Sequence, residues 1–169
     1  MDPELREYWK LLVPVMGRIL NKDHEARYKK TKELYEISTI HVKYLLALRD
    51  KEYTLKDLSE CLSMDKANTT RAISYLESKG YVKDDREAEN SRKFTLSLTD
   101  SGRNVADYLN SDIDQMFSLY FKGISDQDLR IIVRSMERTC MNIDSDGTCE
   151  KIIESLKKTA KYVCSDERS

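Results

Sequence analysis

Between Asp65 and Gly80, hydrogen-bonding side chains alternate with apolar ones at the spacing of an α-helix. The positions expected to pack inward are Thr69, Ala72, Ile73 and Leu76. Helical geometry then turns outward Ala67, Asn68, Thr70, Arg71, Ser74 and Tyr75. Arg71 can donate to two acceptors on guanine, and Asn68 can pair with adenine. Side chains suited to phosphates or less specific contacts are Lys66, Thr70 and Ser74. This face has the chemistry of a nucleic-acid contact, and an ordinary solvated helix face is the alternative.

A shorter helix is expected immediately before this one. Thr54 with Asp57 three positions later is similar to a capping box, which satisfies free N–H groups where a helix begins. The apolar positions of this short helix are Leu55, Leu58 and Leu62. Asp65 can cap the longer helix, and Lys79 with Gly80 provides a basic last turn and a left-handed stop. Two short helices joined by a turn of a few residues are typical of a helix-turn-helix.

The hydrophobic period changes after Gly80. Tyr81 and Val82 begin an extended segment, and a second strand is expected where apolar and small polar residues alternate. In that strand Phe94, Leu96 and Leu98 alternate with Thr95 and Ser97, which predicts one buried face. The polar stretch from Asp84 to Lys93 separates the two strands. A hairpin with a charged tip directly after a helix-turn-helix predicts a wing.

Longer amphipathic helices are expected on both sides of this central unit. The first has apolar residues at helical spacing, namely Leu5, Trp9, Leu12, Met16, Ile19 and Leu20. Further helix starts are expected at Ser38, Thr99, Ser125 and after Gly147. Their apolar faces exceed what the central unit can cover, so a second copy of the chain is the natural partner.

The predicted fold class is therefore mainly α with a small β-hairpin wing, a winged helix-turn-helix flanked by N- and C-terminal dimerisation helices. The predicted divisions are a first dimerisation helix and connector (1–38), the winged helix-turn-helix (39–98) and C-terminal dimerisation helices (99–169). A chain of 169 residues is about one domain long. Its formal net charge is −1, so a nucleic-acid contact must depend on local arrangement of charge.

Several classes of protein are disfavoured by the sequence. The apolar run from Leu11 to Gly17 is far shorter than the ~20 residues that span a bilayer, so we expect no membrane segment and a cytoplasmic protein. Among the five glycines there is no phosphate-binding loop, and no Ser, His and carboxylate set marks a nucleophile, so we expect neither an enzyme nor a cofactor.

The four cysteines do not have metal-ligand spacing. They lie 79, 9 and 15 positions apart, and the chain has two histidines, so no metal site is expected. Three of them lie on apolar stripes and are expected to act as small buried hydrophobes, namely Cys140, Cys149 and Cys164.

This ordered set of features resembles the MarR (multiple-antibiotic-resistance regulator) family of winged-helix transcription factors. The resemblance is strongest from Ile37 to Gly102, and its most specific stretch runs from Asp65 to Val82, followed by the wing and Leu98-Thr-Asp-Ser-Gly102. It implies a homodimer that inserts the outer face of the 65–80 helix into the major groove of a pseudo-palindromic operator. It also implies a transcriptional regulator, most often a repressor.

The wing departs from the pattern of the family it resembles. Such wings usually present an aspartate two positions before an arginine, and here the matching residues are Asn90 and Arg92. The resemblance makes Arg92 and Lys93 candidate DNA contacts. The wing tip is also acidic, because Arg86 is surrounded by Asp84, Asp85, Glu87 and Glu89, and these repel phosphate. The alternative reading is a winged-helix module that binds another protein, like an antirepressor, with weak or no DNA binding.

The resemblance further implies a small aromatic or phenolic effector bound between the dimer helices and the winged unit. Candidate residues for such a site are Trp9, Tyr28, Tyr35, His41 and Tyr44, because rings with polar tips suit such a pocket. Rings at helical spacing are also common core residues, and that alternative stays open at each position.

Overall fold

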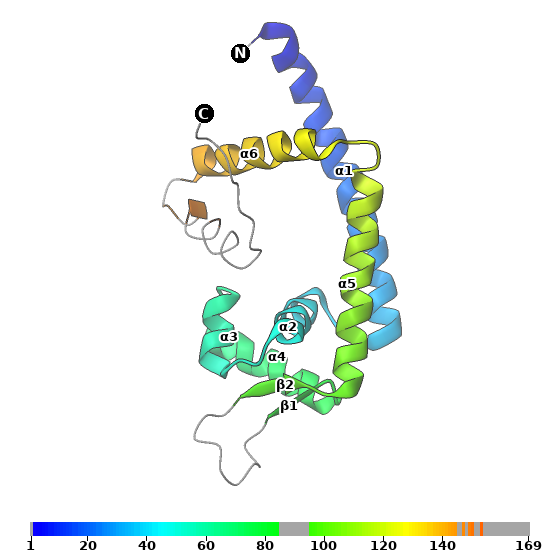
Figure 1. Cartoon of the computed structure of the whole chain (residues 1–169), viewed down its shortest axis with the longest axis vertical. Coiled ribbons are helices and arrows are strands. Elements are labelled where there is room, and N and C mark those ends of the chain that lie inside the picture. The colour runs from blue at the N-terminus through cyan, green and yellow to red at the C-terminus, as the bar shows by residue number, and fades with distance from the viewer. Residues whose placement is uncertain (1, 85–94, 145–146, 148, 151–152, 154–169) are drawn as a thin grey trace. The chain divides into compact units, whose positions relative to one another are not determined.

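The computed structural model describes residues 2–84, 95–144, 147, 149–150 and 153. Its elements, in chain order, are α1 (Pro3–Tyr35), α2 (Thr39–Asp50), α3 (Leu55–Cys61), α4 (Lys66–Ser78), β1 (Val82–Asp84), β2 (Leu96–Leu98), α5 (Asp100–Tyr120) and α6 (Asp126–Ile143) (Figure 1). This mainly helical chain with one two-stranded hairpin confirms the expected fold class. The chain divides into two compact units, residues 1–115 and 116–169, and each is described by itself. The three functional divisions expected from the sequence stay a prediction.

The helix starts follow the capping residues that the sequence indicates. Thr54 Oγ1 accepts from the Asp57 N–H at 3.1 Å and begins α3, and Asp65 Oδ1 accepts from the Asn68 N–H at 2.8 Å and begins α4. At the start of α6, Ser125 Oγ accepts from the N–H of Asp128 at 3.2 Å. These side chains satisfy N–H groups that have no partner within the helix, which is why local sequence located the boundaries well.

The core of the first unit forms where α2, α3, α4, the hairpin and the start of α5 meet. Its largest fully buried side chains are Ile37, Tyr44, Leu45, Leu58, Thr69 and Leu76. Tyr44 and Thr69 are joined by a hydrogen bond of 3.0 Å between their hydroxyls. Since Thr69 Oγ1 donates to the Asp65 carbonyl at 3.0 Å, Tyr44 must be the donor in this pair. Both buried hydroxyls are thus satisfied, and they fix α4 against α2.

The hairpin is antiparallel, with Val82 opposite Leu98 and Asp84 opposite Leu96. The expectation of one buried face on the second strand is wrong, because Ser97 is buried as well as its two neighbours. β2 is the inner strand here. It pairs with β1 along one edge, and along the other Tyr53 exchanges both backbone hydrogen bonds with Leu96. A strand bonded along both edges has less exposed surface than the edge strand that alternation implies.

Thr99 and Gly102 join the end of the hairpin to α5. Thr99 Oγ1 accepts from the Gly102 N–H at 3.0 Å and donates to the Gly80 carbonyl at 2.6 Å, which confirms Thr99 as the helix start. Gly102 lies so close to the residue before β1 that a Cβ built on it would be 1.8 Å from the Tyr81 carbonyl oxygen. Only glycine fits this contact between two backbones.

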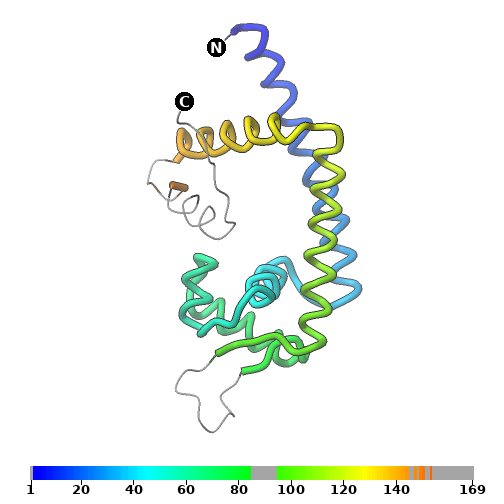
Figure 2. The backbone as a smooth tube through the Cα atoms, in the orientation of Figure 1, coloured from blue at the N-terminus to red at the C-terminus, as the bar shows by residue number. Residues whose placement is uncertain are grey.

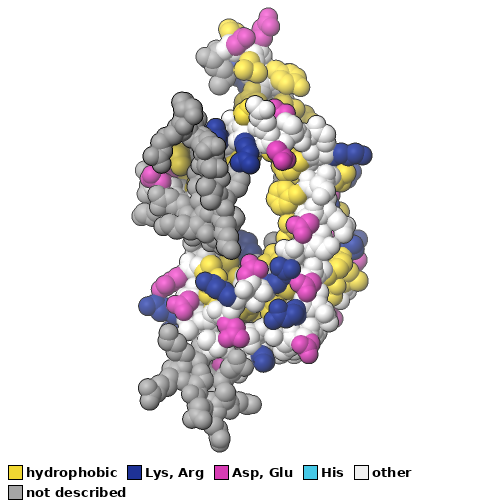
Figure 3. All heavy atoms as spheres, in the orientation of Figure 1, with side chains coloured by type: hydrophobic (Ala, Val, Ile, Leu, Met, Phe, Trp, Pro, Cys, Tyr) yellow, Lys and Arg dark blue, Asp and Glu magenta, His cyan; other side chains and the backbone are white. Residues whose placement is uncertain are grey.

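Two helices leave apolar side chains exposed. In α1, which continues through Pro14, the outward apolar residues include Leu5, Trp9, Leu12, Met16 and Ile19, and Figure 3 shows part of this surface near the N-terminus. α6 has no buried residue although its sequence is strongly amphipathic. Cys140 is therefore exposed, which contradicts the expected burial, because none of the residues that the structure describes buries a position of α6. Cys149 is half-buried, and Cys164 lies outside the described residues, as does most of the helix expected after Gly147.

Within the described part of the chain, no helix combines the length and the apolar character needed to cross a membrane.

We expect Gly102→Ala to lower the free energy of unfolding by about 1 to 3 kcal/mol, because the added methyl group must push two backbones apart. Urea unfolding followed by circular dichroism measures this change. Ser101→Ala is the matched control, since Ser101 is exposed in the same helical turn, and its effect should stay within about 0.5 kcal/mol. Equal stability of the two variants would contradict the close approach at Gly102.

Candidate nucleic-acid interface

One side of α4 is buried and the other is open to solvent. The inward positions Thr69, Ala72, Ile73 and Leu76 are all buried, as expected. The outward positions Lys66, Ala67, Asn68, Thr70, Arg71 and Ser74 are all exposed. The structure therefore gathers the five candidate contacts of this helix, Lys66, Asn68, Thr70, Arg71 and Ser74, on one solvent-facing surface, which we call the α4 outer face.

The side chains of the α4 outer face differ in how free they are to bind. The Asn68 amide donates to the Asp65 carboxylate, and Thr70 Oγ1 donates to the Lys66 carbonyl at 2.8 Å. Within the described residues, the Arg71 guanidinium makes no hydrogen bond or ion pair, and Arg71 is exposed. Arg71 can therefore offer its full set of donors to a ligand, whereas Asn68 is already oriented by the residue that caps the helix.

The outward prediction for Tyr75 is wrong in part, because this side chain is half-buried. Its hydroxyl donates to the Glu36 carbonyl at 2.5 Å, and its ring stacks on His41 with 4.5 Å between centroids and 8° between planes. Glu36 follows α1 directly, and His41 lies in the first turn of α2. Tyr75 thus holds α4 in place instead of facing solvent.

The wing candidates Arg92 and Lys93 lie outside the described residues, together with the acidic residues Asp85, Glu87 and Glu89. Asp84 is described and is half-buried at the end of β1.

The five aromatic candidates for an effector site have different surroundings. Trp9 and Tyr28 are exposed on α1. Tyr35 packs edge-to-face on Tyr108 with centroids 5.3 Å apart, and burial raises its pKa. His41 stacks on Tyr75, and Tyr44 is fully buried in the core. A hollow of about 350 Å³ beside α4 has none of these five in its wall, which consists of Leu55, Thr70, Ile73, Ser74, Glu77, Asp84 and Leu96.

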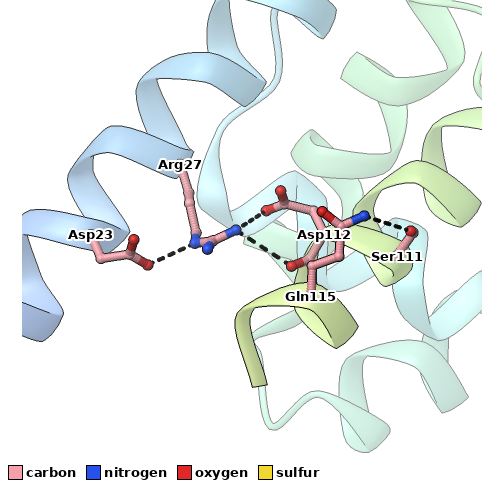
Figure 4. Close-up of polar contacts among 5 residues, drawn as sticks. All are labelled: Asp23, Arg27, Ser111, Asp112 and Gln115. Carbon is pink, nitrogen blue, oxygen red and sulfur yellow. Dashed lines mark hydrogen bonds and ion pairs between the residues drawn. The ribbon is translucent and has the colours of Figure 1, made fainter. Parts of the chain in front are cut away.

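Arg27 joins α1 to α5, and sequence reasoning missed it. Its Nε donates to Asp23 Oδ2 at 2.6 Å, and its Nη1 donates to Asp112 Oδ2 at 2.9 Å (Figure 4). The hydrogen bonds that Arg27 donates to Asp23 and Asp112 raise the pKa of Arg27, so the guanidinium stays charged. The spacing of Asp23 and Arg27 signals a pair on one helix face, but Asp112 lies 85 positions away and leaves no local signal.

Figure 2 shows α1 and the first part of α5 running side by side in this unit, where Arg27 makes that bridge. Among the residues that the structure describes, no three His, Cys, Asp or Glu side chains come together as a metal ion would need.

Comparison with known proteins gives a relative along most of the chain. The sequence is 30% identical over 122 residues to the HTH-type transcriptional regulator BilQ of Clostridioides difficile (strain CD3), covering 69% of this chain and 80% of BilQ. No family model matches the chain.

Solved structures show the same fold. Streptococcus pneumoniae FabT in complex with DNA superposes with a TM-score of 0.66 at 17% identity, covering 80% of this chain and 96% of FabT. A MarR protein from Peptoclostridium difficile superposes with a TM-score of 0.59 at 23% identity, covering 89% of this chain and 92% of that protein. With a BilQ relative at this identity and a helix-turn-helix followed by a hairpin, the chain belongs to the MarR family of HTH-type transcriptional regulators.

Proposed function

We propose that this protein is a sequence-specific, DNA-binding transcriptional regulator that inserts the α4 outer face into the major groove. The observation that carries the proposal is the division of α4 into a buried, mostly apolar side and an exposed side, on which Arg71 has no partner among the described residues. The FabT structure, solved with DNA, supports it by fold. The protein acts by binding and not by catalysis, and its place of action is the DNA of the cytoplasm.

In this proposal the residues of the α4 outer face divide into two roles. Arg71 donates to the two acceptors of a guanine and so selects the base, while Asn68 exchanges its bond to Asp65 for an adenine. Lys66, Thr70 and Ser74 contact phosphates or fix the helix in the groove, together with Arg92 and Lys93 of the wing.

We propose further that the active form is a homodimer. The apolar side chains exposed on α1 and on α6 are more than a lone chain of this size leaves in water, and a second copy would bury them. A symmetric dimer places two α4 helices about one DNA turn apart, ~34 Å, and favours a pseudo-palindromic operator.

We propose that the protein is a repressor and that a small aromatic or phenolic effector releases it from DNA. The support for this proposal is the exposure of Trp9 and Tyr28 on α1, where rings are available to a ligand. Tyr44 is less available, because its hydroxyl is already bonded to Thr69 within the core.

The second candidate function is a protein-interaction module. The acidic wing sequence favours it, since Asp85, Glu87 and Glu89 oppose phosphate at a place where family members use positive charge.

We expect Arg71→Ala to weaken binding to the preferred duplex by about 1 to 3 kcal/mol and to relax base preference. Arg71→Lys is the matched variant. It keeps the charge but not the two-pronged geometry, so base preference should fall while much of the non-specific affinity remains. Lys66→Ala should weaken all duplexes alike and reduce the salt slope by ~1. Fluorescence anisotropy on a duplex enriched by this protein from a random pool measures all three. If Arg71→Ala and Lys66→Ala bind like the parent, α4 does not enter the groove.

The dimer is tested by light scattering, which should give twice the chain mass of 19.8 kDa at micromolar concentration. Met16→Glu should shift the protein toward monomer, because it places a charge on the exposed apolar stripe of α1. Asn21→Glu adds the same charge at another exposed position of α1, on a different side of the helix, and should leave the dimer intact. A parent mass of one chain would refute the dimer.

Replacing Glu87 and Glu89 together by glutamine separates the two candidate functions. If the wing follows the minor groove, the change should tighten binding to all DNA by roughly 1 kcal/mol at low salt. The gain should shrink as salt rises, since charges are screened within ~10 Å at 0.1 M. Titrations at two salt concentrations measure it. Unchanged affinity at both means that the wing does not approach DNA, and the interaction-module reading then gains support.

A further inference from the structure

Four side chains connect the end of α1 with α4, and we call them the α1–α4 joint: Glu36, His41, Tyr75 and Lys79. Glu36 follows α1 in the left-handed backbone region, with φ of 56°, and its carbonyl accepts from the Tyr75 hydroxyl at 2.5 Å. Lys79 Nζ pairs with the Glu36 carboxylate, and that bond lowers the pKa of Glu36. Since Tyr75 and Lys79 lie one turn apart, the last two turns of α4 are held at two points.

The joint also fixes the residues that would contact DNA. Tyr75 lies four positions after Arg71, so the two share one side of α4. A shift of the Tyr75 end therefore changes where the Arg71 end points. Tyr75 is thus placed as a positioning residue for the α4 outer face.

His41 completes the joint in its neutral form. Its Nδ1 accepts from the Ser38 N–H at 3.1 Å, and Ser38 Oγ lies 3.1 Å from the same nitrogen. Because Nδ1 accepts, the single proton of the neutral ring is on Nε2. The ring lies parallel to Tyr75 with centroids 4.5 Å apart. His41 therefore both caps the start of α2 and supports Tyr75 of α4.

A proton on Nδ1 is incompatible with this arrangement. It turns the acceptor into a donor that faces the Ser38 N–H, which then loses its partner. The positively charged His41 ring would also lie against the same Tyr75 ring as the Lys79 ammonium, whose Nζ is 5.7 Å from the centroid of that ring. Glu36, the acid of the joint, is already paired with Lys79 and cannot compensate. A cation is attracted to the face of a tyrosine ring, but the lost hydrogen bond and the nearby Lys79 oppose this attraction and disfavour the protonated His41.

Partial burial agrees with this direction, because it lowers the pKa of His41 below the ordinary 6.5. A histidine held neutral in the fold stabilises it fully above the unfolded pKa. That contribution is lost as the pH falls from about 6.5 through the folded value, since the unfolded chain takes up the proton first.

We propose that the α1–α4 joint positions the reading helix and that protonation of His41 releases it, so that mild acid weakens binding to DNA. This inference rests on the proposed DNA-binding function and adds a means of regulating it.

The chain provides well-matched variants for a test. His41 occupies the N3 position of the capping box of α2, where glutamine is a usual residue. The glutamine of His41→Gln therefore keeps an acceptor for the Ser38 N–H, and its side chain cannot titrate. His24, the other of the two histidines, is exposed on α1, and His24→Gln removes a titrating group away from the joint. Tyr75→Phe removes the bond to Glu36 and keeps the stacked ring.

The experiment measures affinity for a duplex that the parent protein enriches from a random pool at pH 7.5. Between pH 7.5 and 5.5, the parent and His24→Gln should lose roughly ten-fold in affinity, the size expected for loss of a helix cap. His41→Gln keeps the cap but loses the ring that stacks on Tyr75, so it should bind more weakly than the parent at pH 7.5 and then lose less than about two-fold between the two pH values. Tyr75→Phe should bind more weakly at both pH values. If His41→Gln loses as much as the parent, or the parent loses nothing, the proposal is wrong while DNA binding stands.

A second readout needs no DNA. In the free protein, NMR should show Tyr75 ring signals that move with the titration of His41, below the ordinary histidine pKa of 6.5. If no duplex is enriched, the proposed DNA-binding function is wrong. The NMR spectra then test on their own whether protonation of His41 changes the α1–α4 joint. Tyr75 signals that do not follow His41 would overturn it.

Discussion

The hydrogen bond from the Tyr44 hydroxyl to Thr69 Oγ1 sets the rotation of α4, and the proposed site depends on that rotation. Each residue of a helix advances by about 100°, so a slip of one position would bring different side chains to the surface. Thr69 is fully buried and uses its own proton to bond the Asp65 carbonyl, in the residue that caps the same helix. A rotated α4 would leave the buried Tyr44 hydroxyl without its partner, which costs about 1 to 3 kcal/mol.

Charge imposes a second constraint. With a formal net charge of −1, the protein has little general attraction for a polyanion, and the non-specific part of DNA binding must be weak. A single chain that binds DNA through a few well-placed donors is then more selective among sequences, but binds less tightly, than a chain with a large positive charge. Two copies on one operator restore affinity without additional charge, because the second α4 binds at a high effective concentration. A dimer is thus favoured both by the exposed apolar faces of α1 and α6 and by the modest charge of α4.

The sequence predicts well what short-range chemistry decides. Thr54, Asp65 and Ser125 begin helices where expected, because a cap needs only partners two or three residues away. Errors occur where the partner is distant in sequence. Tyr75 was expected to face solvent, but it bonds to a residue 39 positions earlier. Strand alternation did not reveal the burial of Ser97, since that depends on Tyr53 pairing along the second edge of β2.

Two contacts that local patterns could not reveal attach α1 to α5 and to α4. Arg27 bonds Asp112 of α5, and nine residues later Glu36 receives Tyr75 and Lys79 of α4. Nine residues of helix are about 14 Å long and behave as a stiff rod, so the two attachments cannot move independently. The same helix presents the apolar stripe that we assign to the dimer contact. A change in how two α1 helices meet must therefore either break one of these attachments or move α4, and this links the assembly of the dimer to the orientation of its reading surface.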